Sequence, residues 1–392
     1  MRLQNTVRHI LDLENLLFFV AFSAALGIGF VVVPIPLLTL KLGGSVLTLG
    51  WLGTLTAFTY VCSCLAGGLI ARAIPPKGLA IAGAAVSASA YALLSRADCL
   101  DDIFRAAPLS TVGMGTFWVS VQNWLGERGD ARSLQRRAAV FSVSWCSGTV
   151  IGPWAGGALF DRSPAWPFYC ASLAFICSVL MIAITLRRNA NSFADEPEAT
   201  NDRKGADLGR SERLLKVVWT AQFMHWVAFA MTRSIWPKLA SDWNFGGSTI
   251  GSFFAALALV QTLTFALMGI VHGWRFRRHL LYSGQVVACI SVAVMGLASN
   301  SNVLYIAFGM FGMVAALVYT SSIYYSLFHT EKRGMRASIH EALVGSGALV
   351  GPLYGGLLAR IEPWLPFVLM PIVFLAAIFG EELLFRRGNR TS

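Results

Sequence analysis

The sequence holds 392 residues, of which 56% are apolar and 13% are charged, with a net charge of +11 and a mean hydropathy of +0.61. Soluble domains average about 45–50% apolar and about 25% charged residues, so this composition excludes a soluble multidomain enzyme. The basic residues lie in short clusters between apolar runs, which excludes a nucleic-acid-binding groove with a basic stripe and exposed aromatic side chains. The class that remains is a helical protein that crosses a membrane many times.

Apolar runs long enough to cross a bilayer, which takes about 20 helical residues, follow one another along the whole chain. They lie at about 15–40, 46–71, 78–95, 103–125, 137–160, 165–186, 214–236, 247–272, 279–298, 302–328, 338–360 and 363–385. Residues 2–14 precede the first run and predict a short amphipathic helix at the membrane surface. We therefore expect an all-α membrane protein with 12 transmembrane helices.

One long polar stretch, residues 187–212, separates the sixth apolar run from the seventh. It is charged and has no apolar periodicity, which is typical of a mobile linker. It predicts three parts: a first six-helix bundle over 1–186, a linker over 187–212, and a second six-helix bundle over 213–392.

The distribution of lysine and arginine predicts the orientation, because loops that stay in the cytoplasm carry more of them. With the N-terminus inside, 24 of these residues fall on the cytoplasmic side, six on the outside, and Arg233 within a span. This asymmetry requires an even number of spans. We expect an inner-membrane protein with both termini and the linker in the cytoplasm.

The fifth and eleventh apolar runs carry the same pattern, G-x-x-x-G-P-x-x-G-G, at an offset of 199 residues. The first copy consists of Gly148, Gly152, Pro153, Gly156 and Gly157, and the second of Gly347, Gly351, Pro352, Gly355 and Gly356. Glycines four residues apart let the backbone of another helix come close, and proline removes a helical hydrogen bond and kinks the helix. The repeat predicts two pseudo-symmetric bundles that rock against each other, although plain helix packing would also use such glycines.

Twelve helices in a 6 + 6 duplication with this fifth-helix pattern resemble the major facilitator superfamily, whose antiporter motif has the same form. The family also has a G-x-L-a-D-R-x-G-R-K signature between helices 2 and 3. Gly67, Leu69, Arg72 and Lys77 fit it, whereas Ala71 stands where the family has aspartate. The resemblance implies alternating access, with a cavity lined by helices 1, 4, 7 and 10, and the motif is found mainly in proton-coupled exporters.

The residues contain no pattern typical of an enzyme. A P-loop, a Ser/His/Asp arrangement and a metal-ligand spacing are all missing from the sequence. Six of the seven cysteines lie within apolar runs, where cysteine is a small apolar residue. We therefore expect a transporter without a catalytic residue, a metal or another cofactor.

Ionisable residues inside a span are costly and suggest function. Glu341 is the one acid that the sequence places inside a span, since Glu381 and Glu382 fall at the end of the last run. Two interpretations of Glu341 stay open: it carries a coupling proton, or it pairs with arginine in a structural gate on the cytoplasmic side. The candidates for proton coupling or this gate are Glu341, His340, His225, Arg72 and Arg336.

Polar and aromatic residues in the fourth, seventh, eighth and tenth runs are candidates for binding a substrate. They are Arg233, Trp118, Gln122, Asn123, Gln261, Tyr319, Ser322 and Tyr324. Two alternatives stay open, because Arg233 can extend its charge to the outer headgroups and aromatic residues also gather at membrane interfaces.

The hypothesis from sequence is a secondary active transporter that exports a small organic solute in exchange for protons. The alternatives are an importer or facilitator of a small metabolite, such as an anion, and a non-transporting assembly or sensor protein on the same scaffold. The expected partners are the solute, protons and the lipid bilayer. We expect a monomer that binds no nucleic acid.

Overall fold

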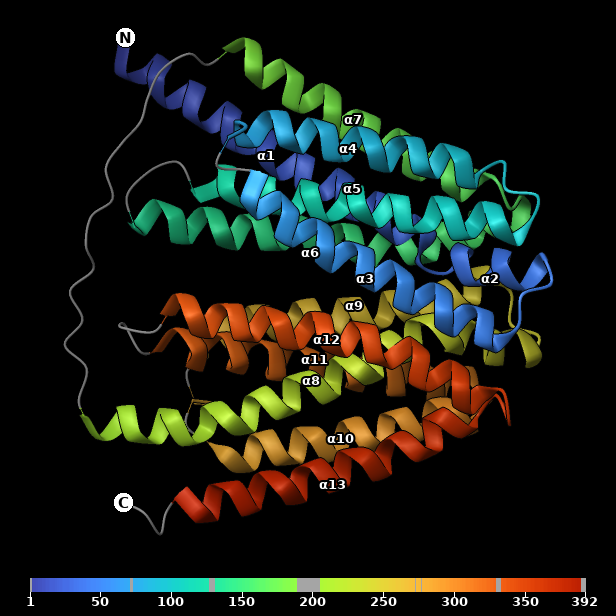
Figure 1. Ribbon diagram of the computed structural model, residues 1–392. Coiled ribbons are helices and arrows are strands. Elements are labelled where there is room, and N and C mark those ends of the chain that lie inside the picture. The colour runs from blue at the N-terminus through green and yellow to red at the C-terminus, as the bar shows by residue number, and fades with distance from the viewer. Residues whose placement is uncertain are drawn as a thin grey trace. The chain divides into compact units, whose positions relative to one another are not determined.

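A computed structural model of the chain describes residues 2–70, 73–126, 131–188, 205–271, 273–275, 277–328 and 333–388. All regular secondary structure in these ranges is α-helical (Figure 1). A helix satisfies all of its backbone hydrogen bonds within one segment, which the hydrocarbon core of a bilayer requires. The all-helical membrane fold predicted from composition is confirmed.

The helices follow the predicted runs closely. Their bounds are α1 (Arg2–Val32), α2 (Pro34–Lys41), α3 (Val46–Ile70), α4 (Pro76–Leu94), α5 (Leu100–Gly126), α6 (Ala131–Arg162), α7 (Trp166–Arg188), α8 (Gly205–Asp242), α9 (Gly247–Ile270), α10 (Arg278–Leu297), α11 (Ser301–Phe328), α12 (Arg333–Ala359) and α13 (Leu365–Gly388). Helices α1 and α2 together fill the first run, and they separate at Val33 because Pro34 lacks the N–H group that would continue α1.

Two expected segments differ from the structure. Residues 2–14 are not a separate helix at the membrane surface, because they belong to the continuous helix α1. The predicted linker is helical at both of its ends, since α7 continues to Arg188 and α8 already begins at Gly205. Residues 189–204 lie outside the described residues.

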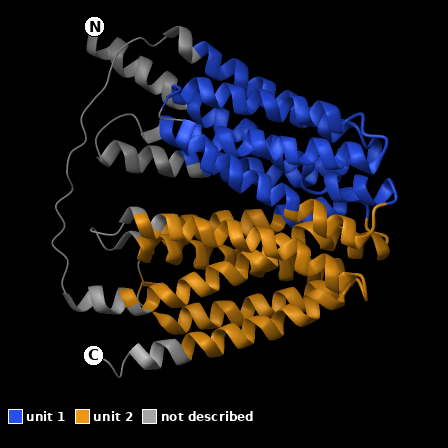
Figure 2. Ribbon diagram, in the orientation of Figure 1, with its two compact units in different colours: residues 1–43, 55–199, 246–255 blue, residues 44–54, 200–245, 256–392 orange. Residues whose placement is uncertain are grey.

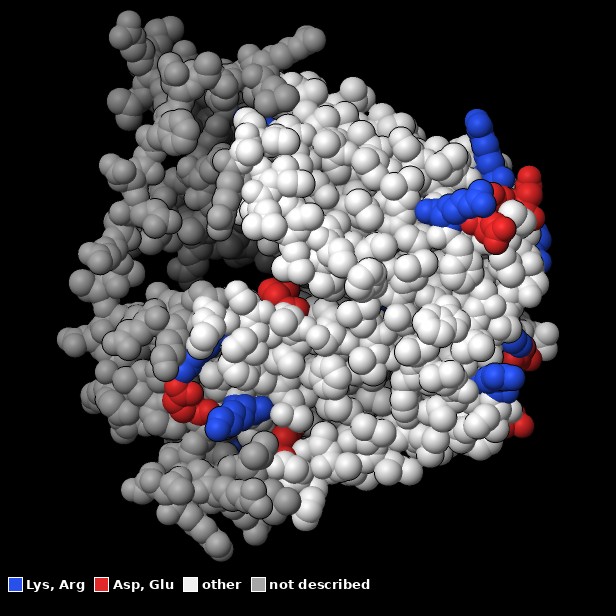
Figure 3. Space-filling view, viewed as in Figure 1, with Lys and Arg blue, Asp and Glu red and all other residues white. Residues whose placement is uncertain are grey.

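Ten helical segments in the described part of the chain are long and apolar enough to cross a membrane. Helices α5 and α6 are equally long but more polar, since α5 carries Gln122 and Asn123 and α6 begins with an arginine-rich turn. On the face in view, charged side chains gather mainly at the two ends of the helices and leave an uncharged band between them (Figure 3). Such a band is what the hydrocarbon core selects.

The chain forms two compact units (Figure 2). Unit 1 contains Met1–Gly43, Leu55–Ala199 and Gly246–Ala255, and unit 2 contains Gly44–Thr54, Thr200–Phe245 and Ala256–Ser392. Each unit therefore includes the first turns of a helix that continues in the other unit. These are the start of α9 in unit 1 and the start of α3 in unit 2.

The two units use the same helix pairs. In unit 1, α1 packs against α6 and α7, and α4 packs against α5 and α7. In unit 2, α8 packs against α12 and α13, and α10 packs against α11 and α13. These four pairs in unit 1 have their counterparts in unit 2, so the duplication seen in the sequence is confirmed as a structural repeat.

Candidate functional site

The first glycine-proline copy lies on α6 and brings the backbones of α6 and α1 into contact. A Cβ atom on Gly152 would lie 2.5 Å from Cα of Gly29 in α1. A Cβ atom on Gly148 would lie 2.7 Å from the backbone N of Leu26, and one on Gly156 would overlap the carbonyl of Phe30. These three glycines form one face of α6, and no side chain fits between that face and α1.

The second copy lies on α12 and makes the matching contact with α8 in unit 2. A Cβ atom on Gly347 would lie 2.8 Å from the carbonyl O of Phe223, and one on Gly351 would overlap the carbonyl of Val227. Gly355 packs against the side chain of Met231, whose Cγ would lie 2.7 Å from a Cβ atom on Gly355. The first, fifth and ninth residues of the pattern thus have the same packing role twice.

The proline and the last glycine of each copy contact the N-terminal turns of a second helix, other than α1 or α8. In unit 1, Pro153 and Gly157 of α6 meet Gly251 and Gly247 at the beginning of α9. In unit 2, Pro352 and Gly356 of α12 meet Gly50 at the beginning of α3, with Cα of Gly50 at 2.8 Å from a Cβ atom on Gly356. Each copy therefore packs against two helices at once.

The α9 contact ends in charged hydrogen bonds. The carboxylate of Asp161, near the end of α6, accepts the backbone N–H of Gly247 and that of Ser248, each at 2.7 Å. A carboxylate at a helix N-terminus satisfies unpaired N–H groups and interacts favourably with the helix dipole. The start of α3 is capped differently, by reciprocal hydrogen bonds between Ser45 and Thr48.

Unit 2 holds a column of aromatic rings between α8 and α11. The ring of His225 stacks on that of Phe311 at 4.4 Å between centroids, and Phe311 in turn stacks on Phe229 at 6.4 Å. The guanidinium of Arg233 lies 5.7 Å from the centre of the Phe229 ring, a cation–π distance. The sequence analysis named His225 and Arg233 as candidate functional residues. It did not name Phe311 and Phe229, which lie between them.

Several polar atoms in this column are buried without a hydrogen-bond partner among the described residues. They are both ring nitrogens of His225 and the amide nitrogen of Gln222, which lies one turn earlier on α8. Buried polar groups in native proteins are almost always paired. Unpaired donors and acceptors beside flat aromatic faces can serve a solute or a proton.

A second cluster joins α11 to the beginning of α12. Ser322 and Nδ1 of His340 share a hydrogen bond of 2.8 Å, and the ring of Tyr319 meets the His340 ring edge-on at 5.0 Å. Nε2 of His340 is buried and has no partner among the described residues. Tyr319 also contacts Phe265 of α9, with 6.0 Å between the ring centroids. Three predicted residues therefore meet here.

Arg336 was one of two arginines considered as a gate partner of Glu341, and the structure pairs it with another acid. Arg336 is buried and donates instead to the carboxylate of Glu212 in α8, a residue that the sequence assigned to the linker. Glu341 is exposed. The other proposed gate residue, Arg72, lies outside the described residues.

The remaining predicted residues are spread over three places. Trp118 in unit 1 is buried between Phe117 and Phe141, while Gln122 and Asn123 on the same helix are exposed. The remaining two belong to unit 2: Gln261 is half-buried on α9, and Tyr324 of α11 packs against Trp274.

The burial of one acid was not predicted from the sequence. Glu381 was assigned to the membrane interface at the end of the last run, but its side chain is 1% exposed and accepts a hydrogen bond from Gln285. A search of the described residues for three or more histidine, cysteine, aspartate or glutamate side chains that could hold a metal ion finds none.

Comparison with known proteins gives a consistent result. The family model described as Major Facilitator Superfamily matches residues 17–226 and 218–391. Quinolone resistance protein NorA of Staphylococcus aureus is 22% identical over 92% of this chain and 94% of its own length. Multidrug resistance protein 2 of Bacillus subtilis is 22% identical over 42% of each chain.

Solved structures show the same fold at low identity. A bacterial homologue of the human lysosomal transporter Spinster, in an inward-facing and unoccupied conformation, matches with a TM-score of 0.75 and 12% identity over 96% of this chain and 98% of that one. A POT family transporter in complex with 5-aminolevulinic acid matches with a TM-score of 0.78 and 14% identity over 96% of each chain.

Proposed function

We propose, on the premise that the chain belongs to the major facilitator superfamily, that this membrane transporter exports a small, partly apolar organic solute in exchange for protons. Membership makes it a multi-pass transporter rather than an enzyme. Solute class, direction and coupling are the parts that we propose.

The observation that carries the proposal is the combination of aromatic rings and unpaired histidine nitrogens in unit 2. Flat rings such as Phe229 and Phe311 offer apolar faces for a planar solute. The nitrogens of His225 and His340 that lack partners among the described residues can take up a proton. Glu341 follows His340 directly and is our candidate for the proton that is exchanged.

The relatives support the direction of transport. Two of them are named for resistance, one to quinolones and the other to multiple drugs. Export lowers the internal concentration of a drug, which is one physical route to resistance. Quinolones are flat and partly apolar, as the aromatic column would require.

A second candidate is import or facilitated passage of a small anion. Arg233 favours it, because this half-buried cation lies at the end of the aromatic column. The two candidates differ in driving force, since an anion facilitator needs no opposing proton gradient.

We further propose that the chain acts as a monomer in the inner membrane with its termini in the cytoplasm. One chain already supplies both six-helix bundles of the family fold. The excess of lysine and arginine on one side of the predicted spans supports this orientation.

The test is transport by the purified chain in liposomes with an imposed pH gradient. Ethidium is a suitable probe, because its permanent positive charge prevents passive trapping in acidic vesicles. Proton antiport predicts ethidium accumulation in acid-inside vesicles, and no accumulation when the gradient is reversed or when the protein is left out.

The same vesicles separate the second candidate. The second candidate predicts that a small organic anion is taken up at a rate independent of the pH gradient. Loss of this uptake in Arg233→Gln would favour facilitated passage of anions. Ethidium uptake at the same level under both gradient directions would refute proton coupling.

A further inference from the structure

The buried contact between α10 and α13 contains an amide and an acid whose hydrogen bonding is incomplete. Gln285 and Glu381 are each 1% exposed, and Nε2 of Gln285 donates to Oε2 of Glu381 at 2.8 Å. Both helices belong to unit 2, where they pack against each other.

The second oxygen of each group has no partner. Oε1 of Gln285 and Oε1 of Glu381 are buried and unpaired among the described residues. An amide oxygen only accepts hydrogen bonds, and so does an ionised carboxylate, whereas a protonated carboxyl group donates one. A hydrogen atom on Oε1 of Glu381 turns this acceptor into a donor, and the unpaired acceptor on the side chain that already donates to the same carboxyl group is the amide oxygen of Gln285.

From this we infer that Glu381 is a proton-binding site, occupied in this conformation and closed by Gln285 into a ring of two hydrogen bonds. In this ring the amide donates to Oε2 of Glu381, and the acid donates from Oε1 to the amide oxygen. The site lies on α10 and α13, apart from the residues of the proposed transport function, and its occupancy does not depend on that function.

The surroundings of the pair favour a proton over a cationic partner. Around it, α10 carries Tyr282 and Arg278, and the guanidinium of Arg278 lies 3.7 Å from the neighbouring carboxylate of Glu382. A buried carboxylate without a cation is costly, which favours its neutral form.

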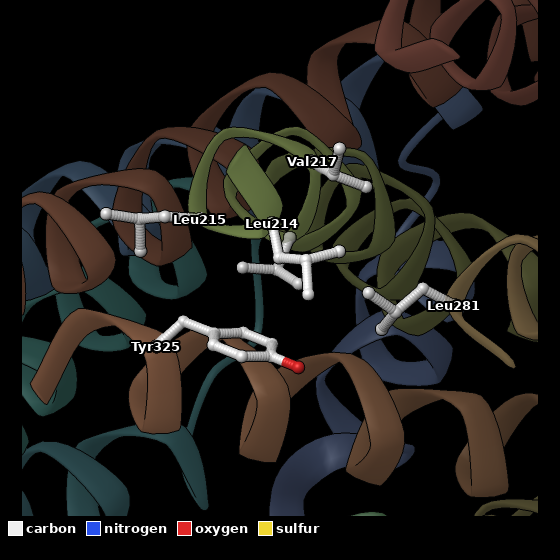
Figure 4. Packing of buried hydrophobic residues seen from close by; sticks show 6 residues of the cluster. Leu214, Leu215, Val217, Leu281 and Tyr325 are labelled. Carbon is white, nitrogen blue, oxygen red and sulfur yellow. The ribbon is translucent and has the colours of Figure 1, made fainter. Parts of the chain in front are cut away.

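Among the described residues, the other two neighbours of α13 bring no hydrogen-bond or ion-pair partner to Glu381. Helix α8 contributes a buried apolar cluster of Leu214, Leu215, Val217 and Val218, which packs with Leu281 of α10 and Tyr325 of α11 (Figure 4). On α12, Arg336 pairs with Glu212 and His340 with Ser322, while Glu341 is exposed. A neutral Glu381 is thus compatible with every element packed against α13.

Infrared spectroscopy of the purified full chain tests the inference, because a protonated carboxyl group has its own carbonyl band. The wild-type chain should show this band at neutral pH, and Glu381→Gln should lose it. Glu362→Gln is the matched control, since it removes an exposed acid from the same unit and should leave the band in place. The glutamine at 381 can also form two hydrogen bonds with Gln285, so we expect this variant to fold.

Gln285→Leu supplies an independent measurement if Glu381→Gln fails to fold. This change removes the donor to the Glu381 carbonyl oxygen, so the carboxyl band should shift in frequency. A wild-type band that is unchanged in both variants, or a wild-type chain with no such band at neutral pH, would overturn the inference. Neither result depends on transport, so it leaves the proposed export function to its own test.

Discussion

The two glycine-proline helices, α6 in unit 1 and α12 in unit 2, pack alike but differ in the titratable side chains at corresponding positions near each end. Helix α12 begins with Arg336, His340 and Glu341, whereas the positions of α6 that match the last two are Phe141 and Ser142. Near its end, α6 instead carries Asp161, which contacts the start of α9. The corresponding residue of the second copy is Arg360, directly after α12.

The comparison shows that the glycines serve helix packing in both copies, whereas the titratable residues differ between them. Both copies keep the glycine face because a backbone contact leaves no room for a side chain, whatever the helix does. The charged residues lie outside that face and have diverged between the copies. We therefore expect substitutions of the glycines to have the same effect in both units. A substitution of Glu341 should affect transport, and one of Asp161 should affect stability.

The largest expected effect comes from a bulky residue on the glycine face. Gly152→Leu and Gly351→Leu should each abolish folding or transport, because the new side chain meets backbone atoms of α1 or α8. Overpacking of this kind costs about 1–3 kcal/mol or more. Size-exclusion elution and thermal midpoint of the purified variants measure it.

Gly269→Leu is the matched control, since among the described residues no atom beyond its own turn of α9 lies within 4 Å of a Cβ atom at that position. Loss in only one of the two variants would show that the copies are not equivalent. Normal transport by both would show that the repeated pattern has no mechanical role.

The second effect should appear in transport and not in folding. If Glu341 carries the coupling proton, Glu341→Gln should abolish ethidium uptake driven by a pH gradient but leave exchange without a gradient largely intact. The neutral amide resembles the protonated acid and cannot cycle between two charge states.

Glu362→Gln, which removes an exposed acid just after α12, should transport normally. Unchanged gradient-driven uptake by Glu341→Gln would eliminate its role in coupling. His225 and His340 would then be the titratable groups left to examine.

The sequence predicted the elements and the packing of the repeat, because hydropathy defines spans and glycine spacing defines close contacts. It did not predict which side chains meet. A helix that is apolar on all sides has no distinct face, so the stack of His225 on Phe311 could not be inferred. Glu212 appeared as part of a polar linker and Glu381 as an interfacial acid, and only the fold shows that they contact Arg336 and Gln285.

A smaller effect is expected at the opposite end of the repeat. Asp161→Ala removes the acceptor for two N–H groups of α9, and loss of such a cap costs about 0.5–2 kcal/mol. The thermal midpoint should fall, while Arg360→Gln, at the corresponding position directly after α12, should leave it unchanged. Equal midpoints for wild type and Asp161→Ala would show that this contact does not stabilise the folded chain.

The smallest expected effect is on the protein itself, because the last prediction needs only chemical labelling of Cys99. It asks on which side of the membrane the end of α6, with Asp161, lies. Cys99 precedes α5 and is exposed, with its S–H group donating to the carboxylate of Asp102 at 3.2 Å. This hydrogen bond, together with one from the backbone of Asp98, holds the pKa of Asp102 below its usual range. The turn should therefore keep its structure through neutral and mildly acidic pH and lose it only as the pH falls through that lowered pKa. In the predicted topology of twelve spans, α5 and α6 each cross the membrane once, so we expect Cys99 and Asp161 on the same side. An impermeant maleimide applied to intact cells at neutral pH should label the wild-type chain and not Cys99→Ser. Labelling of a cysteine introduced at Ser192, in the predicted cytoplasmic linker, would instead invert the orientation and with it the sides that we assign to Asp161 and Glu341.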